Sequence, residues 1–298
     1  FCAINENLKL FFQKFFGQHY RYIPSIKTQG AISGNLYKDN LTGSSLWSMD
    51  IHHKQEFENK VEFKGALAIA SSTSPKQIVN DNTEERTART SDSYAVINKN
   101  WENSSFDVIA RYKQTLDNNT DDTLGELPKI TYKVQSTQIG QTPLYFDFET
   151  SSAWFVTDLK PEKNDDFFFK TSRLDVRPQI SFPIPLTSWL SMNQSIGARG
   201  TFYGKGLTKD YEPGGQSGAF KKHPSFTRES LDFGTNVKGP MFSKTYRFKK
   251  SSTKIKHLLG PNFSYSYIPD IDEEDRLKIK SFDSVDNISP ANSVTYAF

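Results

Sequence analysis

The chain has no run of about eighteen consecutive apolar residues, so we expect no transmembrane helix. The phenylalanine cluster at residues 11–16 is too short for one, and Gln13 and Lys14 interrupt it. We also expect no secretory leader in this sequence, because it starts at Phe1 and shows no basic segment with a small-residue cleavage site. We therefore expect a piece of a longer precursor.

Cysteine and excess charge are both scarce. The single cysteine, Cys2, can form no disulfide within the chain, so it is either a free thiol or the partner of a segment outside this sequence. A net charge of +3 is small for 298 residues. It predicts no nucleic-acid partner.

Patterns typical of catalytic or metal sites are lacking as well. His52 and His53 are adjacent on an expected strand, so their imidazoles point to opposite faces and cannot share one metal ion. The glycines of residues 211–224 lack the strand-to-helix frame and the Gly-Lys-Ser/Thr ending of a phosphate-binding loop, so we expect a flexible loop there. The sequence predicts no catalytic residue, no cofactor or metal site, and no enzyme.

Charged clusters leave two interpretations open. The acidic clusters are Asp121-Asp122, Asp165-Asp166 and residues 270–275; solvated loop carboxylates are the ordinary interpretation, and binding of divalent cations at a lipid surface is the alternative. The same choice, between solvated charge and contact with anionic lipid groups, applies to Arg89, Arg111, Arg199, Lys221 and Lys222.

What the chain does contain is aromatic and turn-forming residues. Aromatics make up 14%, and Phe and Tyr dominate them, which favours many strands joined by polar turns. The mean hydropathy of −0.61 would suit a soluble protein. It is also compatible with a membrane barrel, in which only alternate side chains face lipid.

Alternation with a period of two runs through the chain. From Ile255 to Tyr267 every second residue is mostly large and apolar or aromatic, with polar residues between, as in a strand with two different faces. We predict an all-β, antiparallel up-and-down transmembrane β-barrel, with about twelve strands of a larger barrel present. The expected strands are residues 26–37, 46–56, 61–70, 94–101, 105–116, 128–136, 143–156, 170–184, 189–206, 230–248, 254–268 and 292–298.

The connections between these strands are expected to alternate in length. Long polar connections are expected near residues 71–93, 117–127, 157–169, 207–229 and 269–291, and short ones near Glu58 and residues 102–104, 137–142, 185–188 and 249–253. Outer-membrane barrels have long loops outside the cell and short periplasmic turns. The alternation therefore favours such a barrel over a soluble sandwich.

Aromatic, proline and glycine residues add local expectations. Tyr and Trp near strand ends fit girdles at the membrane interfaces, with ordinary strand aromatics as the alternative; they are Tyr20, Tyr22, Tyr37, Trp47, Trp101, Trp154, Trp189, Tyr203, Tyr267 and Tyr296. Pro178, Pro183, Pro185 and the Gly239-Pro240 step are expected to bend strands or interrupt ladders.

Three stretches carry a family resemblance. The C-terminal one contains His257, Leu259, Pro261, Tyr265, Tyr267-Ile268-Pro269, Asp270, Phe282-Asp283, Asp286-Asn287-Ile288, Asn292 and Val294-Thr295-Tyr296. The middle one contains Leu127-Pro128, Thr131-Tyr132, Gly140, Thr142-Pro143 and Tyr145-Phe146. The third contains Arg173, Asp175, Pro178, Trp189, Gly197, Arg199, Thr201 and Tyr203. In order and spacing they resemble the outer-membrane lipopolysaccharide-assembly family, the large barrels also called organic solvent tolerance proteins.

The resemblance implies a role and partners. It implies a translocon that inserts lipopolysaccharide into the outer leaflet of the cell outer membrane. The implied partners are lipopolysaccharide, a plug lipoprotein (LptE-like), a periplasmic bridge protein (LptA-like) and outer-membrane lipids. Residues 1–298 would form a partial barrel domain, without the family's N-terminal periplasmic jellyroll and its C-terminal strands.

Two other functions remain open from the sequence. A general outer-membrane channel or receptor barrel would share the strand and connection pattern but not the three stretches. A soluble carbohydrate-binding β-sandwich would stay in aqueous solution without detergent.

Overall fold

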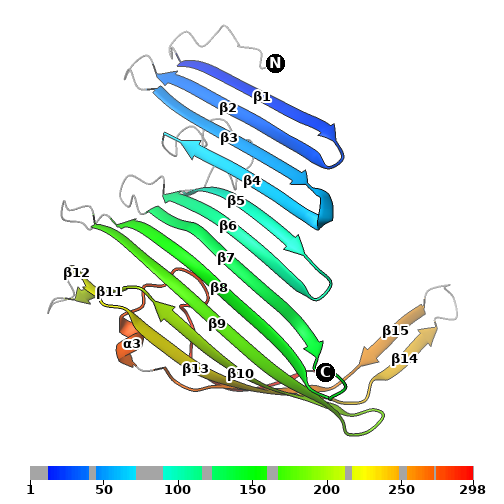
Figure 1. Ribbon diagram of the computed structural model, residues 1–298. Coiled ribbons are helices and arrows are strands. Elements are labelled where there is room, and N and C mark those ends of the chain that lie inside the picture. Colours follow the sequence, from blue (N-terminus) through cyan, green and yellow to red (C-terminus); the bar gives the residue numbers. More distant parts are fainter. Residues whose placement is uncertain are drawn as a thin grey trace. The chain divides into compact units, whose positions relative to one another are not determined.

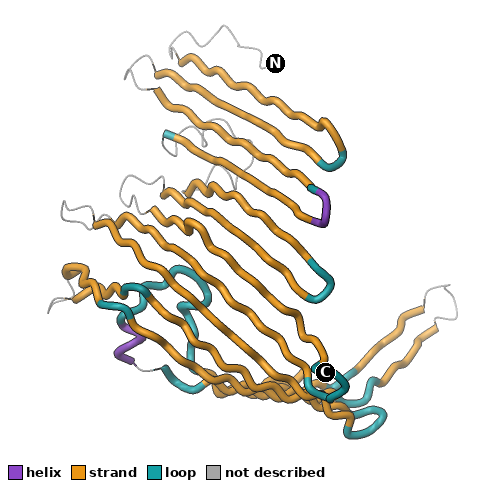
Figure 2. Tube along the Cα trace, in the orientation of Figure 1, coloured by secondary structure: helices purple, strands orange, loops and turns teal. Residues whose placement is uncertain are grey.

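The computed structural model describes residues 13–39, 45–71, 90–115, 123–159, 167–211, 217–247, 254–271 and 273–297. Strands dominate this part of the chain (Figures 1 and 2). The described helical segments are η1 (Glu58–Lys60) and α3 (Glu273–Leu277). Neither is long and apolar enough to cross a membrane.

Thirteen strands form one hydrogen-bonded sheet in the order β1-β2-β3-β4-β5-β6-β7-β8-β9-β10-β13-β16-β17. Neighbours in the sheet are thus also neighbours along the chain, apart from two inserted hairpins. The thirteen are β1 (Gln13–Ser25), β2 (Thr28–Asp39), β3 (Ser45–Glu56), β4 (Val61–Ala70), β5 (Thr90–Asn100), β6 (Ser104–Thr115), β7 (Thr123–Gln138), β8 (Tyr145–Leu159), β9 (Phe167–Pro185), β10 (Ser191–Tyr203), β13 (Phe226–Lys238), β16 (Asn262–Ile268) and β17 (Ala291–Ala297).

This architecture confirms the all-β, antiparallel up-and-down prediction, and it is consistent with a partial β-barrel. Each of the twelve expected strands corresponds to a strand of the sheet; β4 has the expected ends, and the ends of the others are shifted. The sequence prediction missed β1, which pairs with β2 from Gln13↔Asp39 to Tyr22↔Gly30. Its alternation is hard to read because Lys14 and Gly17 fall among the aromatic residues.

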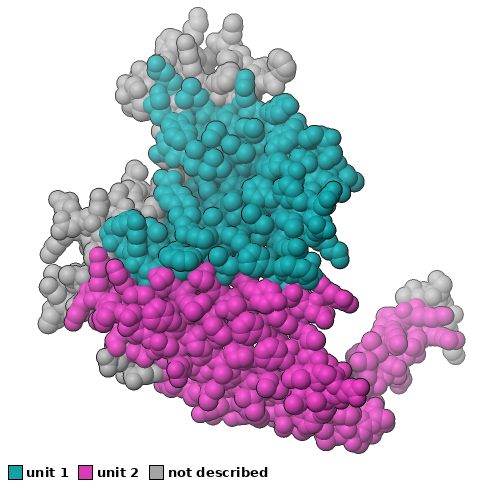
Figure 3. Space-filling model, viewed as in Figure 1, with its two compact units in different colours: residues 1–101, 105–130, 153–171 teal, residues 102–104, 131–152, 172–298 magenta. Residues whose placement is uncertain are grey.

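The chain divides into two compact units, which are described separately (Figure 3). Unit 1 comprises residues 1–101, 105–130 and 153–171; unit 2 comprises residues 102–104, 131–152 and 172–298.

Within unit 1 the strand register separates two kinds of side chain. One row across β1 to β4 reads Tyr20↔Ile32↔Ile51↔Leu67. The adjacent row, on the other face, reads Arg21↔Ala31↔His52↔Ala66↔Tyr94 and runs on into β5. Residues directly opposite each other share a face, so one face is apolar and the other carries the charges.

Unit 2 shows the same separation over five strands. An apolar row reads Ile184↔Met192↔Val237↔Phe263↔Tyr296 across β9, β10, β13, β16 and β17. A row on the other face reads Ser181↔Ser195↔Gly234↔Ser266↔Ser293. We call these two sides the apolar face and the polar face.

Two hairpins leave the sheet where single strands or loops were expected. The 207–229 connection, expected as a loop, contains β11 (Gly206–Tyr211) paired with β12 (Ser217–His223). The expected strands 230–248 and 254–268 each break in two. Their outer parts, β14 (Phe242–Arg247) and β15 (Lys254–Leu259), pair only with each other among the described residues. The breaks fall at Gly239-Pro240 and Gly260-Pro261, where each proline removes a ladder donor.

The prediction that long and short connections alternate strictly is therefore only partly correct. Short connections at residues 26–27, 57–60, 101–103, 139–144 and 186–190 follow every odd-numbered strand up to β9. Two of the expected long connections are shorter than predicted, because β7 begins at Thr123 and the 160–166 connection separates β8 from β9. The β13–β16 connection was expected to be short, and it contains the β14–β15 hairpin instead.

Most of the expected interface aromatics are exposed, as girdle residues would be. Trp47, Trp101, Trp154 and Trp189 all retain more than a third of their surface. Tyr203 is buried on the polar face, and Tyr22 is half-buried. The side chain of Tyr37 lies outside the described residues.

The prolines of β9 disturb its pairing with β10 less than the sequence predicts. Pro183 and Pro185 keep their register opposite Asn193 and Ser191. Pairing with β10 is absent only at Arg177 and Pro178, and the register is the same on both sides of this gap. The break is therefore local.

The turn between β7 and β8 explains the glycine in the middle stretch. Gly140 has a φ of 56°, in the left-handed region. A Cβ built on it would meet nothing within 4 Å. The turn is closed by Ile139 N, which donates to Leu144 O at 2.9 Å. Backbone conformation alone therefore requires glycine here.

We predict that Gly140→Ala lowers the free energy of unfolding by about 1 kcal/mol, because an L side chain disfavours the left-handed region. Gly140→Asn should cost less, since asparagine visits this region more readily. Unfolding of the detergent-solubilised protein in urea measures both. Gln141→Ala is the control, and an equal loss in this variant would contradict the backbone explanation.

Candidate functional site

One of the most deeply buried charged side chains described in unit 2 is Arg173, on β9. Its guanidinium side chain is 1% exposed. Arg173 Nη1 donates to Asp283 Oδ1 at 2.7 Å and to Asp286 Oδ1 at 2.8 Å, and Nη2 donates to Asp283 Oδ2 at 2.7 Å. The planar guanidinium binds both oxygens of Asp283 with two separate nitrogens, a bidentate geometry that a lysine could not reproduce.

Asp286 is the acceptor at the centre of this cluster. Its side chain is 0% exposed. Oδ1 accepts from Arg173 and from the Tyr203 hydroxyl at 2.8 Å, while Oδ2 accepts from the backbone N–H of Phe282 at 2.9 Å. Asp283 Oδ1 in turn accepts from Val285 N at 2.9 Å. The two aspartates therefore shape their own turn as well as bind the sheet.

The side chain of Arg228, on β13, binds the backbone carbonyls of the same turn. Arg228 Nη2 donates to Val285 O, and Nη1 donates to Asp286 O at 3.2 Å. The guanidinium lies 5.7 Å from the centre of the Tyr203 ring, which stacks on Phe226 at 4.8 Å between ring centroids. The stacked aromatic pair therefore lies beside the Arg228 guanidinium, which binds backbone carbonyls of the turn.

A third layer lies beneath these contacts. Thr201 Oγ1 donates to Asp175 Oδ1 at 2.7 Å, and Arg199 Nε lies 3.5 Å from Asp175 Oδ2. The cluster thus contains Arg173, Arg199 and Arg228 opposite Asp175, Asp283 and Asp286. Because the formal charges cancel, the cluster avoids an unpaired buried charge.

The sheet positions these side chains in two adjacent rows. One row across β9, β10 and β13 is Arg173↔Tyr203↔Phe226, and the next is Asp175↔Thr201↔Arg228. Residues two apart on a strand share a face, so both rows project from the polar face. They lie at the end of the strands opposite the short 186–190 turn.

The residues between β16 and β17 therefore fold back onto the polar face. α3 and the coil after it lie beside β11 and β13 in Figure 1. A second attachment is Leu207 N, which donates to Lys278 O at 2.9 Å. A Cβ on Gly206 would come within 2.8 Å of the same carbonyl oxygen, so the approach depends on glycine. We call residues 282–286 with their Arg173 and Arg228 contacts the anchored turn.

Other charged candidates from the sequence are placed differently. Arg199 belongs to the buried cluster, whereas Arg111 Nε lies 3.8 Å from Asp92 Oδ1 and both side chains are about half exposed. Asp270 is exposed, and Asp275 accepts from Lys278 Nζ at 3.3 Å. Lys221 and Lys222 are exposed. Cys2, Arg89, Asp121-Asp122 and Asp165-Asp166 lie outside the described residues.

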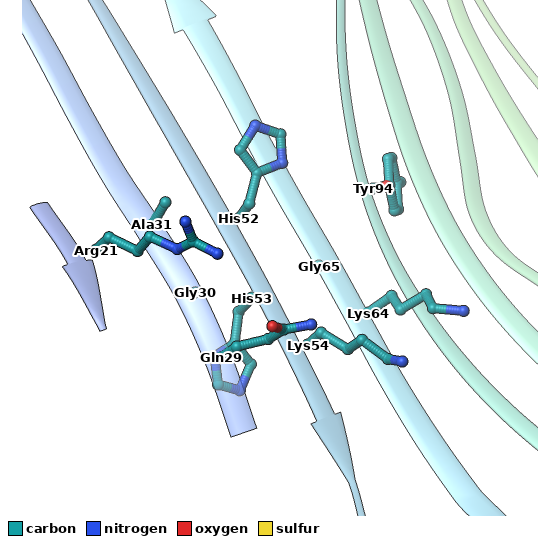
Figure 4. A pocket seen from close by; sticks show the side chains of 10 residues that line it. All are labelled: Arg21, Gln29, Gly30, Ala31, His52, His53, Lys54, Lys64, Gly65 and Tyr94. Carbon is teal, nitrogen blue, oxygen red and sulfur yellow. The ribbon is translucent and has the colours of Figure 1, made fainter. Parts of the chain in front are cut away.

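His52 and His53 lie on opposite faces, as the alternation indicates. His52 faces a hollow of about 380 Å³ on the polar face of unit 1, whose lining also includes Arg21, Lys54, Lys64 and Tyr94 (Figure 4). His53 Nδ1 is hydrogen-bonded to the Tyr22 hydroxyl at 2.6 Å. In the described part of the chain, no group of three or more His, Cys, Asp or Glu residues could hold a metal ion.

The lysines of this hollow are engaged by neighbouring carboxylates. Lys54 Nζ lies 3.0 Å from Glu56 and 2.9 Å from Glu62, and Lys64 Nζ lies 2.7 Å from Glu62. These four side chains are between 24% and 51% exposed. The pairs therefore contribute little to stability. The hollow has charge but no built catalytic arrangement.

Sequence reasoning named most members of the buried cluster but not their contacts. Arg173, Asp175, Arg199, Thr201 and Tyr203 were part of the third stretch, and Asp283 and Asp286 part of the C-terminal one. The structure brings these two stretches together across more than a hundred residues of sequence. Arg228 was missed. The sequence prediction placed it in the 207–229 connection, whereas β13 begins at Phe226 and carries Arg228 on the polar face.

Comparison with known families decides the relationship. The family model described as LptD, LPS transport system D, matches residues 46–298. The chain belongs to the LptD family. This is an outer-membrane family that transports lipopolysaccharide, and it is not an enzyme family. No curated protein matches the chain.

The LptD match contains all three stretches that carry the resemblance. It also contains β9, β10 and β13 and the anchored turn. The buried cluster is therefore a feature of the matched part of the chain, and it connects two segments that the sequence separates widely.

We predict that Arg173→Met releases the anchored turn, because it leaves the buried Asp286 and the half-buried Asp283 without the cation that pairs with both. Removing one partner of a buried ion pair costs about 3 kcal/mol or more. Trypsin should then cut after Arg276 or Lys278 much faster than in the unchanged protein. Timed digestion of the detergent-solubilised protein with mass spectrometry of the fragments measures the rate.

Arg177→Met is the matched control on the same strand and face. Arg177 is 36% exposed and lies 3.5 Å from Asp232, so its loss should leave the digestion rate nearly unchanged. Equal acceleration in the two variants would show that Arg173 does not hold the turn specifically.

Proposed function

We propose that this chain is part of an outer-membrane translocon that inserts lipopolysaccharide into the outer leaflet. The observation that carries the proposal is the LptD match over residues 46–298. It covers the strands whose register separates apolar from polar side chains. A general channel or receptor barrel would share that separation, but the family match favours transport.

The two faces suit the two halves of the transported molecule. Ile184, Met192, Val237 and Phe263 lie on the apolar face and match acyl chains. Serine residues line the corresponding row of the polar face and can form hydrogen bonds with a saccharide. The lipid-facing side of the sheet is thus separated from the path that we assign to the sugars.

The anchored turn gives that path a fixed boundary. It covers Arg173, Tyr203 and Arg228 at the end of the strands away from the short turns. In outer-membrane barrels the short turns are periplasmic and this end faces outward. The saccharide would therefore pass the anchored turn last, just before it leaves the polar face.

The proposed assembly includes two protein partners. A periplasmic bridge protein would deliver lipopolysaccharide at the short-turn end. A plug lipoprotein would occupy the polar side. Both partners, and the position of the chain in the cell outer membrane, belong to this proposal, which the family membership supports.

A photoreactive amino acid at Asn193 should capture lipopolysaccharide in living cells. Asn193 is exposed on the polar face near the short-turn end of β10. Its neighbour Met192 lies on the apolar face at the same depth, next to phospholipid of the inner leaflet, and is the matched control. The expected result is a lipopolysaccharide adduct at Asn193 and none at Met192, detected by immunoblotting after irradiation.

Two results would contradict the proposal. Equal capture at both positions would mean that the polar face is not the path. No capture at Asn193, in a protein that conducts ions or small solutes, would favour the channel alternative.

A further inference from the structure

The β14–β15 hairpin is the one described part of unit 2 that stands off the sheet at the short-turn end. β13 and β16 remain paired as far as Lys238↔Asn262, and Gly239 N donates to Pro261 O at 2.8 Å. Beyond this point β14 and β15 pair with each other over six positions, from Phe242↔Leu259 to Arg247↔Lys254. Figure 1 shows the hairpin directed away from the other strands.

The position of the hairpin is set by the register of β10. Ser191, the first residue of β10, lies opposite both Lys238 and Pro185. The hairpin therefore leaves the sheet at the same end as the 186–190 turn. Short turns of outer-membrane barrels face the periplasm, so the hairpin starts where the sheet meets the periplasmic surface of the membrane.

Charge on this hairpin is of one sign. The sequence contains no Asp or Glu between Asp232 and Asp270. The described part of the hairpin contains four cations, Lys244, Arg247, Lys254 and Lys256, and all four are exposed. Mutual repulsion between them is unfavourable in isolation, so an anionic surface nearby would be stabilising.

Large apolar side chains accompany the cations and are exposed too. Phe242, Tyr246, Ile255 and Leu259 share one face by register, and they are between 39% and 57% exposed. Met241, at the base, is 75% exposed. A water-surrounded hairpin would gain from burying them, and two strands alone provide no core for this.

We propose that the β14–β15 hairpin docks onto the anionic phospholipid surface on the periplasmic side of the membrane. Cations close to a membrane-crossing segment bind anionic headgroups. Aromatic and aliphatic side chains beside them enter the headgroup boundary. An acidic protein would complement the charge as well. The lipid surface is favoured because only Gly239 to Met241 separate the hairpin from β13, whose Val237 lies on the apolar face.

This inference depends on β13 and β16 crossing the membrane, and it does not depend on lipopolysaccharide transport. It adds a second membrane contact to the strands themselves. The docked hairpin would fix the orientation of the periplasmic end of the sheet.

The test uses a fluorophore attached through Ser243→Cys in a Cys2→Ser background. Ser243 is exposed on β14. The protein is placed in lipid nanodiscs whose headgroups carry a nitroxide quencher, either purely zwitterionic or rich in phosphatidylglycerol. We expect quenching to rise at least about twofold with phosphatidylglycerol, and high salt to reverse the rise.

Charge variants separate electrostatic docking from mere proximity. Replacing Lys244, Arg247, Lys254 and Lys256 by Gln should abolish the dependence on phosphatidylglycerol. The triple variant Lys244→Arg, Lys254→Arg and Lys256→Arg keeps every charge and should retain it. A label attached through Ser188→Cys, in the exposed 186–190 turn, should be quenched equally in both kinds of disc.

Each contrary result has a distinct meaning. Quenching at Ser243 that ignores phosphatidylglycerol, with normal quenching at Ser188, overturns the docking proposal alone. Absence of quenching at Ser188 overturns the membrane placement of the strands. A change at Ser243 only after the purified periplasmic bridge protein is added would identify a protein-binding hairpin and overturn the lipid proposal.

Discussion

Hydrocarbon offers no partner for a backbone N–H or C=O, so a chain that crosses it with strands has to pair these groups between neighbouring strands. The long antiparallel ladders of this protein meet that requirement. They also force successive side chains onto opposite faces. Both the apolar face and the polar face follow from this pairing. The anchored turn binds to the polar face, and the β14–β15 hairpin begins where the ladder between β13 and β16 ends.

The polar face contains a cluster of charged side chains whose burial would be costly in free energy without partners of opposite charge. Arg173 and Asp286 are nearly without solvent and Asp283 is half-buried, yet each charge is opposed by another and each carboxylate accepts several hydrogen bonds. A buried cluster of this kind is weak support for overall stability, since desolvation offsets much of the attraction. Its stronger effect is on position. Two arginines on different strands bind one turn, and few other placements of residues 282–286 would satisfy both.

Proline and glycine act at the opposite end. Pro183 and Pro185 are accommodated within the ladder of β9, whereas Gly239-Pro240 and Gly260-Pro261 end β13 and begin β16. The difference is that the second group falls on both strands of one pair at the same level. Losing donors on both sides ends the pairing, and the remaining residues form a separate hairpin. Fixed attachment at one end and a projecting cationic hairpin at the other thus arise from different local chemistry on the same strands.

The sequence alone determined the strand pattern, because a period of two is a local property that any window of residues shows. Twelve strands and the two-faced rows followed from it, and three stretches were enough for the family. It could not determine that Arg173 meets Asp286 or that Arg228 takes part, because those contacts depend on register across three strands. Nor could it separate β14 from β13, since alternation continues through residues 242–247. Only the tertiary structure shows where one ladder stops and another begins, because hydrogen-bond partners are chosen by neighbouring strands and not by the strand itself.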